Sequence, residues 1–452
     1  MKSGVLLLTL LLTVATVAAQ TVIEGRVEDA NTKEPIPYAL LFVEGTSTGT
    51  QANLDGVYCL KVASKDAGGR VVVSYAGYGT DTIEVQRLRR HSTVRLRPLT
   101  LSLRDVEIVE YTKSSALLKE VARRIPENYW TDTTVGTYFF RRYSLTSDSL
   151  WLFCEALADV MRPGYDKQYY QKGGLVVVDT RGTRDSVALA GNHKRFPTSR
   201  MLVYDTAMLK RMLGDSIYAH NPFAGRSQTE YDDVNAFSDM LQATKGSYWF
   251  NGKRARKIDK RSRLTLYDDE NGNSYYLIIL VTDRDSAALL INHSDKALLH
   301  YYYTTLRADT VRLPFPFNRI LDGVWSPYSR VQYDYAKVSD RYMLVFSMQA
   351  SAYGILEPKR SLVGGKINRE IRRIITDDVV EDYRMWTMLD MHPADSSFLS
   401  TTLPIQHGKR RYYHDVFGHG DGLDELWEQY NTVPVEERIA TKLRAAMDKQ
   451  SK

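Results

Sequence analysis

Short apolar segments separated by turn-forming residues fill the N-terminal part of the chain, and they constrain the fold more than any other feature. Between residues 21 and 98 these segments alternate apolar with polar side chains, as half-buried strands do. Gly, Pro, Asn and Asp separate them at intervals of about ten residues. This pattern predicts about seven short strands in a small antiparallel β-sandwich.

Four strings of this region resemble a known domain. They begin at Gly25 (GRVEDANTKEPIPYA), Val43 (VEGTSTGT), Asn53 (NLDGVYCL) and Ser74 (SYAGYGT). Together they are similar to the carboxypeptidase-like regulatory domain, a transthyretin-like, Ig-like sandwich common in envelope proteins of bacteroidete-type bacteria. The resemblance implies that residues 20–98 form one such domain, which carries no catalytic residue despite its name.

Turn residues inside the expected sandwich have a physical role. Asp55 and Gly56 suit the turn before the next strand. Gly77 and Gly79 lie in a loop that requires positive φ angles, which glycine adopts without steric cost. Both turns therefore agree with the sandwich.

Two features of the chain suggest hydrolases, and neither has the required context. The segment Gly45–Gly49, GTSTG, matches a nucleophile elbow, but an elbow needs a strand running directly into a helix, and a polar loop follows here. A zinc carboxypeptidase needs His and Glu three residues apart plus a distant His. Of the nine histidines, His392 alone has a carboxylate three residues later, and Pro393 favours a turn there. We therefore expect no peptidase of this kind.

The N-terminus has the pattern of an export signal. One charge at Lys2 precedes an apolar run and small residues that end at Ala19. We expect residues 1–19 to be a signal peptide cleaved after Ala19; the alternative is an uncleaved anchor, because residues 3–23 are uncharged and just long enough to span a bilayer. No cysteine lies near the cleavage site, which excludes a lipoprotein, and no later stretch approaches a spanning length. The chain is thus expected in the periplasm or at the outer membrane or cell surface, with no transmembrane segment after cleavage.

Two cysteines, Cys59 and Cys154, follow the signal. An oxidising compartment permits one disulfide between them. They lie 95 residues apart (154 − 59) and in different expected domains, which favours two separate thiols.

Beyond a linker at residues 99–113, we expect residues 114–452 to form one larger antiparallel β-rich domain. Asn271-Gly272 is the clearest hairpin turn, and Ser339-Asp340 suggests a second hairpin. The strands are interpreted as a long meander curled around one face. The fold class is therefore mainly β, with a sandwich followed by a larger sheet.

Helices are expected at both ends of the β-rich domain. Ser114 or Ser115 can cap a helix that Pro126 ends. A C-terminal helix begins near Pro434, and Trp427 ahead of it is a candidate core anchor. The segment from Pro126 onward, PENYW, resembles a region that follows the regulatory domain in a group of uncharacterised envelope proteins, which implies no known activity.

One His/carboxylate cluster lies near the C-terminus. The string HDVFGHGDGLDE contains His414, His419, Asp421 and Asp424, which are weak candidates for metal ligands. A glycine-rich surface turn leading into the Trp427 helix is the favoured alternative, because the Asp-x-Asp pair of a calcium loop is missing. No catalytic, cofactor-binding or metal-binding residue is therefore assigned.

A basic segment at residues 253–263, KRARKIDKRSR, holds seven Lys and Arg residues. A solvated strand face is the simpler interpretation, and contact with anionic lipid or glycan headgroups is the alternative. Nucleic acid is not expected as a partner of an exported protein.

Composition places the chain among globular proteins, since its 452 residues are 43% hydrophobic and 25% charged with a net charge of +6. The leading hypothesis is a non-catalytic exported cell-envelope protein, not an enzyme. Its sandwich would serve as an interaction or spacer module, and its β-rich domain would bind an envelope protein, glycan or lipid without a cofactor. Two alternatives stay open. One is a periplasmic carrier of an apolar ligand, such as lipid or lipoprotein, in a curled sheet; the other is a hydrolase with an unrecognised Ser/His/Asp triad.

Overall fold

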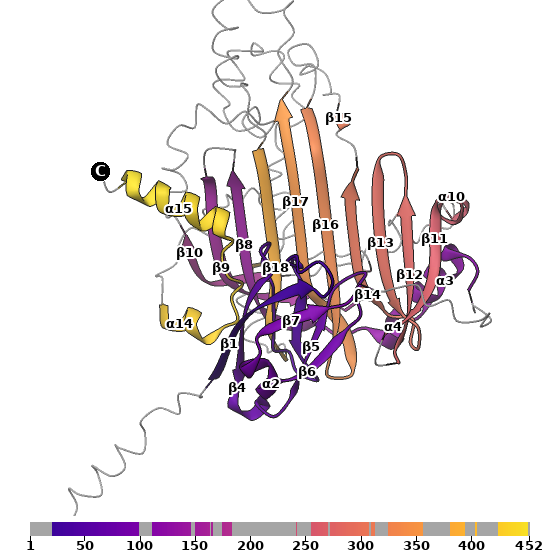
Figure 1. Ribbon diagram of the computed structural model, residues 1–452, viewed down its shortest axis with the longest axis horizontal. Coiled ribbons are helices and arrows are strands. Elements are labelled where there is room, and N and C mark those ends of the chain that lie inside the picture. The colour runs from indigo at the N-terminus through magenta and orange to yellow at the C-terminus, as the bar shows by residue number, and fades with distance from the viewer. Residues whose placement is uncertain are drawn as a thin grey trace, which may run out of the picture.

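The computed structural model of the chain contains three β-sheets and few helices (Figure 1). This confirms the fold class expected from the sequence. The structure describes residues 20–98, 111–145, 150–162, 164–165, 174–182, 241, 255–269, 272–306, 309–311, 324–355, 380–393, 403–404 and 424–450.

Residues 20–98 form the expected sandwich of two small sheets. One sheet has the strand order β4-β1-β7 and the other β3-β2-β5-β6. Alternate side chains such as Val27, Leu41 and Leu60 are buried between them. The bounds are β1 Gln20–Asp29, β2 Leu40–Val43, β3 Gly49–Gln51, β4 Val57–Ala63, η1 Ser64–Asp66, β5 Arg70–Ser74, β6 Asp81–Glu84, α2 Val85–Arg90 and β7 Thr93–Leu96.

Three details of the sandwich differ from expectation. β1 pairs with β7 in parallel, because the chain passes through the other sheet between these two strands. The string DTIEVQRL is half strand and half helix, since Val85 and Leu88, three positions apart, bury one side of α2. Gly56 and Gly77 have the expected positive φ angles of 75° and 87°, whereas Gly79 does not and instead donates its N–H to the Arg97 carbonyl.

The β-rich region forms a single twelve-stranded sheet. Its order is β11-β12-β13-β14-β16-β17-β18-β8-β9-β10-β19, with β15 beside β16, and every pair is antiparallel. It is not one continuous meander, because β8 joins the sheet beside β18. The bounds are β8 Thr134–Leu145, β9 Leu150–Arg162, β10 Gly174–Gly182, β11 Ser262–Asp268, β12 Ser274–Val281, β13 Asp285–Asn292, β14 Leu298–Thr305, β15 Asp309–Val311, β16 Val324–Val338, β17 Arg341–Ile355, β18 Val380–Pro393 and β19 Leu403–Pro404.

Both predicted hairpins are confirmed. β11 and β12 pair in register up to Asp268 and Ser274, and Gly272 in their turn has a φ of 82°. β16 and β17 pair through the turn at Ser339, whose φ is 59°. Turn chemistry therefore fixed these registers locally.

The large sheet has two faces that different elements cover (Figure 1). The sandwich, α14 (Asp424–Gln429) and α15 (Glu437–Gln450) cover one face, which we call the sandwich face. Helices α3 (Ser114–Arg123) and α4 (Ile125–Asn128) pack on the opposite face, which we call the helix face. The small sheet β3-β2-β5-β6 lies between the sheet β4-β1-β7 and the large sheet, so three sheets stack in layers.

The helices correct three expectations. Neither Ser114 nor Ser115 caps α3; instead Asp259 accepts hydrogen bonds from the N–H and Oγ of Ser115, at 2.9 and 2.7 Å. Asp259 belongs to α10 (Ala255–Arg261), so this part of the basic segment is a helix and not a strand. Pro126 lies in the first turn of α4, where its missing N–H costs no hydrogen bond, and α3 ends before it. No helix among the described residues is both long and apolar enough to span a bilayer.

Candidate functional site

The residues that the sequence proposed as metal ligands lie mostly outside the described residues. This holds for His414, His419 and Asp421, and also for the cleavage residue Ala19. Asp424 is the first residue of α14. Within the described part of the chain, no group of three or more His, Cys, Asp or Glu side chains is placed to hold a metal ion.

The GTSTG segment is a turn between two strands, as the loop interpretation predicted. It connects β2 to β3, and no helix follows Ser47, so the strained strand-to-helix geometry of a nucleophile elbow is missing. The Ser47 hydroxyl donates to Oδ1 of Asp390 on β18, at 2.5 Å. Ser47 is therefore a contact between the sandwich and the large sheet.

Cys59 is a free thiol on β4. Burial raises the pKa of this thiol, and the neighbouring carboxylate of Glu24 raises it further. A thiol with a raised pKa is a poor nucleophile at neutral pH. This agrees with the expectation of separate thiols and gives Cys59 no catalytic role.

A buried polar network joins the sandwich to the large sheet around Asp334 of β16. Its Oδ1 contacts Nδ1 of His300 at 2.5 Å, and its Oδ2 accepts bonds from the side-chain amides of Gln51 at 3.1 Å and Gln332 at 2.7 Å. Asp334 is fully buried, and the other three side chains are at most 3% exposed. Gln51 comes from β3 of the sandwich, 283 residues away in sequence. The sandwich therefore supplies a polar partner to a charge that would otherwise be costly to bury.

The His300–Asp334 pair resembles two members of a catalytic triad, but the described residues supply no third member. A triad needs a hydroxyl or thiol that the histidine can deprotonate. Among the residues that the structure describes, the side-chain partner of His300 is Asp334 alone. The amides that bind Asp334 hold the pair inside an interface, so its geometry suits docking better than turnover.

Three tyrosines form a second contact between the two domains. Tyr38 of the sandwich stacks on Tyr383 of β18, with ring centroids 6.0 Å apart, and Tyr383 stacks on Tyr143 of β8 at 4.6 Å. Burial raises the pKa of all three hydroxyls, so they stay neutral. Tyr38 has a φ of 60°, which is unusual for an aromatic residue and is held in place by this packing.

An ionic cluster next to the tyrosines anchors the C-terminal segment to the sheet. Arg141 of β8 donates to Glu155 of β9 at 2.8 and 2.6 Å, and to the carbonyl oxygens of Pro434 at 3.0 Å and of Val433. Glu436 lies 3.7 Å from the same guanidinium. All three charged side chains are at most 2% exposed. Burial raises the pKa of Glu436, and the charge of Arg141 opposes this only in part.

The C-terminal segment also holds the sandwich. The side-chain amide of Asn431 accepts from the backbone N–H of Lys61 and donates to its carbonyl at 3.1 Å, which mimics a neighbouring strand on the free edge of β4. Asp55 accepts the N–H of Glu437 at 2.9 Å and so caps α15 from the sandwich. Trp427 is 3% exposed in the same core, which confirms it as the expected anchor. Residues 427–437 therefore clamp the sandwich and the sheet together.

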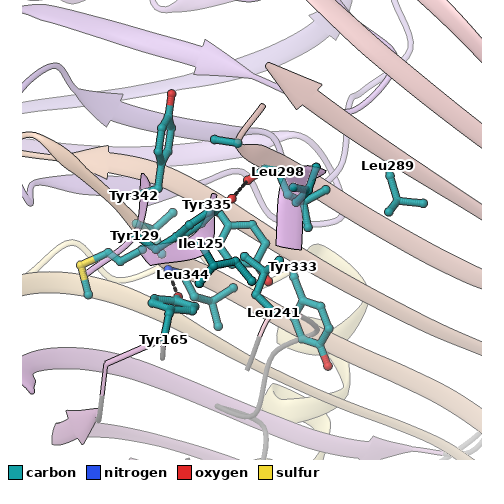
Figure 2. Close-up of a cluster of buried hydrophobic side chains, with 14 of the residues drawn as sticks. Ile125, Tyr129, Tyr165, Leu241, Leu289, Leu298, Tyr333, Tyr335, Tyr342 and Leu344 are labelled. Atoms are coloured by element: carbon teal, nitrogen blue, oxygen red, sulfur yellow. Dashed lines mark hydrogen bonds between the residues drawn. The ribbon is translucent and has the colours of Figure 1, made fainter. Parts of the chain in front are cut away.

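The helix face is filled by the chain's own side chains where the structure describes it. Figure 2 shows Ile125 of α4 and Tyr129, which follows α4, packed against Tyr335 and Leu344 of the sheet. The hydroxyl of Tyr129 donates to the Leu298 carbonyl at 2.8 Å. This part of the face is a packed core.

The interface residues were missed by sequence reasoning because they form no motif. His300 lies within a tyrosine-rich strand, Asp334 stands between two tyrosines, and Arg141 is followed by a second arginine, Arg142. The one available signal was a charge at a position where alternation places an inward-facing side chain. Such a charge requires a partner, although the sequence does not say which.

The comparisons with known proteins agree with the sandwich. None of the curated proteins matches the chain. A crystal structure of a LolA superfamily protein from Nitrosomonas europaea is similar over 66% of this chain and 99% of its own, with 9% identity and a TM-score of 0.23. A domain described as an outer membrane lipoprotein-sorting protein from Vibrio parahaemolyticus is similar over 63% of this chain and 97% of its own, with 7% identity and a TM-score of 0.22. A structure of lipovitellin is similar over 63% of this chain and 28% of its own, with 7% identity and a TM-score of 0.25. Similarity at this level carries no functional information.

The family comparison covers the sandwich and runs past its last strand, β7. The matching model begins within β1 and extends into the segment expected as a linker. The two sheets of the sandwich fall inside this match. Residues 23–108 are a CarboxypepD_reg-like domain.

Proposed function

We propose that this chain is a non-catalytic exported protein of the cell envelope, in which the sandwich is an interaction module mounted rigidly on the large sheet. The β-rich region would bind a partner or ligand in the envelope. The observation that carries this proposal is the buried network around Asp334. A module that serves as a flexible spacer has no need for a carboxylate shared between Gln51 and His300 in a dry interface.

The rigid mounting has a direct thermodynamic test. If the two domains are one unit, calorimetry of the full chain should give a single unfolding transition, because neither can leave the interface without exposing Asp334. Gln51→Leu should lower the midpoint of that transition or split it in two. Thr82→Leu, at an exposed position on β6 of the same domain, is the matched control. A separate sandwich transition in the unmodified protein would refute rigid mounting.

The absence of catalysis is tested on the pair that most resembles a catalytic site. The purified protein is assayed against peptide, ester and glycan substrates beside His300→Ala and His293→Ala. His293 is the control because it lies in the turn before β14 and stacks on Tyr276, away from Asp334. We expect no turnover in any of the three. Turnover that is lost in His300→Ala and kept in His293→Ala would overturn the proposal in favour of a hydrolase.

Export is tested on the processed chain. We expect the protein recovered from an envelope fraction to start at Gln20, the first residue of β1. A chain that retains residues 1–19 would instead support the membrane-anchor alternative.

A further inference from the structure

Exposed apolar side chains gather at one corner of the large sheet. Ile279 and Val281 of β12 are 37% and 54% exposed, and Leu306 after β14 is 50% exposed. These are three of the five large apolar side chains that stand out to solvent in the described part of the chain. Such a concentration marks a contact surface rather than scattered surface residues.

Five unpaired cations lie at the same corner. They are exposed and, within the part of the chain that the structure describes, their side chains form no ion pair or hydrogen bond. Four come from α10 and one from β11: Arg256, Lys257, Lys260, Arg261 and Arg263. Asp259, the acid of α10, is already bound to Ser115. Among the described residues, the next exposed acid along the chain after α10 is Asp283, in the turn between β12 and β13.

Strand register and chain connection bring the two groups to one end of the sheet. Arg263 lies directly opposite Ile279, so both side chains leave the sheet on the same face. α10 packs on the helix face through Ile258 and joins the other residues where β11 begins. Val281 pairs with Ser286, Ser286 pairs with Thr304, and the N–H of Leu306 bonds to the Arg284 carbonyl, so all end at the same edge. Strands stand about 4.8 Å apart, which puts the corner within about 15 Å from β11 to β14. In Figure 1, α10 lies at the outer end of β11 on the rim of the molecule.

We propose that this corner docks on an anionic phospholipid surface. Unpaired Lys and Arg side chains are attracted to lipid phosphates, and aliphatic side chains beside them can enter the boundary between headgroups and acyl chains. A soluble polyanion would use the cations and gain nothing from Val281 or Leu306. The corner shares no residue with the Asp334 network, so the proposal does not depend on the sandwich being an interaction module.

The electrostatic part is tested by vesicle flotation of the full chain. Vesicles of phosphatidylcholine alone should not bind it, and vesicles with added phosphatidylglycerol should, with binding that weakens as salt rises. The variant Arg256→Glu/Lys257→Glu/Lys260→Glu should bind at least about tenfold more weakly. The matched control is Arg87→Glu/Arg89→Glu/Arg90→Glu on α2, which reverses three exposed cations on the sandwich and should bind normally.

The apolar part separates a membrane from a soluble polyanion. Val281→Ser/Leu306→Ser should weaken binding to the anionic vesicles several-fold and leave binding to heparin unchanged. The milder variant Lys257→Gln/Lys260→Gln, with its thermal midpoint measured, repeats the charge test if the triple reversal disturbs folding. Equal vesicle binding by the α10 variants and the α2 control would overturn the proposal. Vesicle binding that is indifferent to Val281 and Leu306 would also overturn it and assign the corner to a soluble polyanion.

Discussion

Replacing Arg141 with Met should be among the most damaging single changes in the described part of the chain. The substitution removes one guanidinium that holds two bonds to Glu155, two bonds to backbone carbonyls and the charge contact with Glu436. Both carboxylates stay behind at 2% exposure or less, without a counter-charge. Removing one partner of a buried ion pair costs about 3–5 kcal/mol, and the two orphaned carbonyls of the C-terminal segment add to this.

Urea denaturation measures this loss, and hydrogen exchange locates it. We expect the free energy of unfolding to fall by about 4 kcal/mol, with the largest loss of amide protection in residues 431–445 because Arg141 holds that segment to the sheet. Adding Glu155→Gln and Glu436→Gln to the variant should restore part of the loss, since most of the cost is the burial of unpaired negative charge. The control is Arg123→Met. The Arg123 side chain is 58% exposed in its ion pair with Glu120, so its loss should lower the free energy of unfolding by less than about 1 kcal/mol. A loss for Arg141→Met as small as that of the control would refute the anchor.

Three further predictions follow from single positions. Burial raises the pKa of Glu436 above its ordinary value of 4.5, so the native state holds this proton more tightly than the unfolded chain and stability falls as pH rises through that window. In urea titrations, the free energy of unfolding of Glu436→Gln should therefore rise relative to that of the unmodified protein as the pH goes from acidic to neutral. A difference between the two proteins that does not change with pH would contradict this. Gly25→Ala should lower the free energy of unfolding by about 1–3 kcal/mol, because its Cβ would lie 2.0 Å from the Ser92 carbonyl oxygen. Gly68→Ala is the control in the same assay and should change it little, because a Cβ there would have no atom within 4 Å. Because burial raises the pKa of the Cys59 thiol, native protein should react with a disulfide reagent more slowly than the urea-unfolded chain; equal rates would show an accessible, activated thiol.

Local chemistry made the sandwich and the hairpins predictable. The turn at Gly56 and the hairpin turn at Gly272 need glycine at positive φ, and each sits between strands whose alternation is visible in the sequence. Ile439 of the C-terminal helix is buried, and Leu443, one helical turn later, packs against the same cluster. These features depend on residues within one or two elements, so a single sequence contains the information.

Helix α10 and the cap of α3 show where that information ends. The string around Ile258 has too few residues for a clear period, and its basic character suits a strand face as well as a helix. Asp259 caps α3 from 144 residues away, so no local pattern links it to Ser115. A short element whose stability comes from a distant partner cannot be recognised from its own sequence.

The tyrosine excess gains a physical explanation from the interfaces. Thirty tyrosines stand against thirteen phenylalanines, and many of the described ones are buried where two elements meet. Tyr129 bonds the Leu298 carbonyl, and Tyr165 accepts the N–H of Leu344. A phenol fills space as phenylalanine does and also satisfies a backbone group that a docked element leaves without a partner. The tyrosines therefore serve contacts between layers, which composition does not reveal.

Stacking of the sandwich on the large sheet also limits where a ligand can bind. On the sandwich face, a ligand over β16 or β18 would have to displace Gln51 and Tyr38, which would leave Asp334 buried with fewer donors. The row beside it is mixed: His300, Asp334 and Thr387 are polar, and Phe346 of β17 pairs with both Asp334 and Thr387. On the helix face, Phe140 and Trp386 pack with their ring centroids 4.4 Å apart, so an apolar ligand there would have to displace side chains of the core. Among the described residues of the large sheet, exposed large apolar side chains lie at the corner near Val281, which is the contact surface we propose for the envelope.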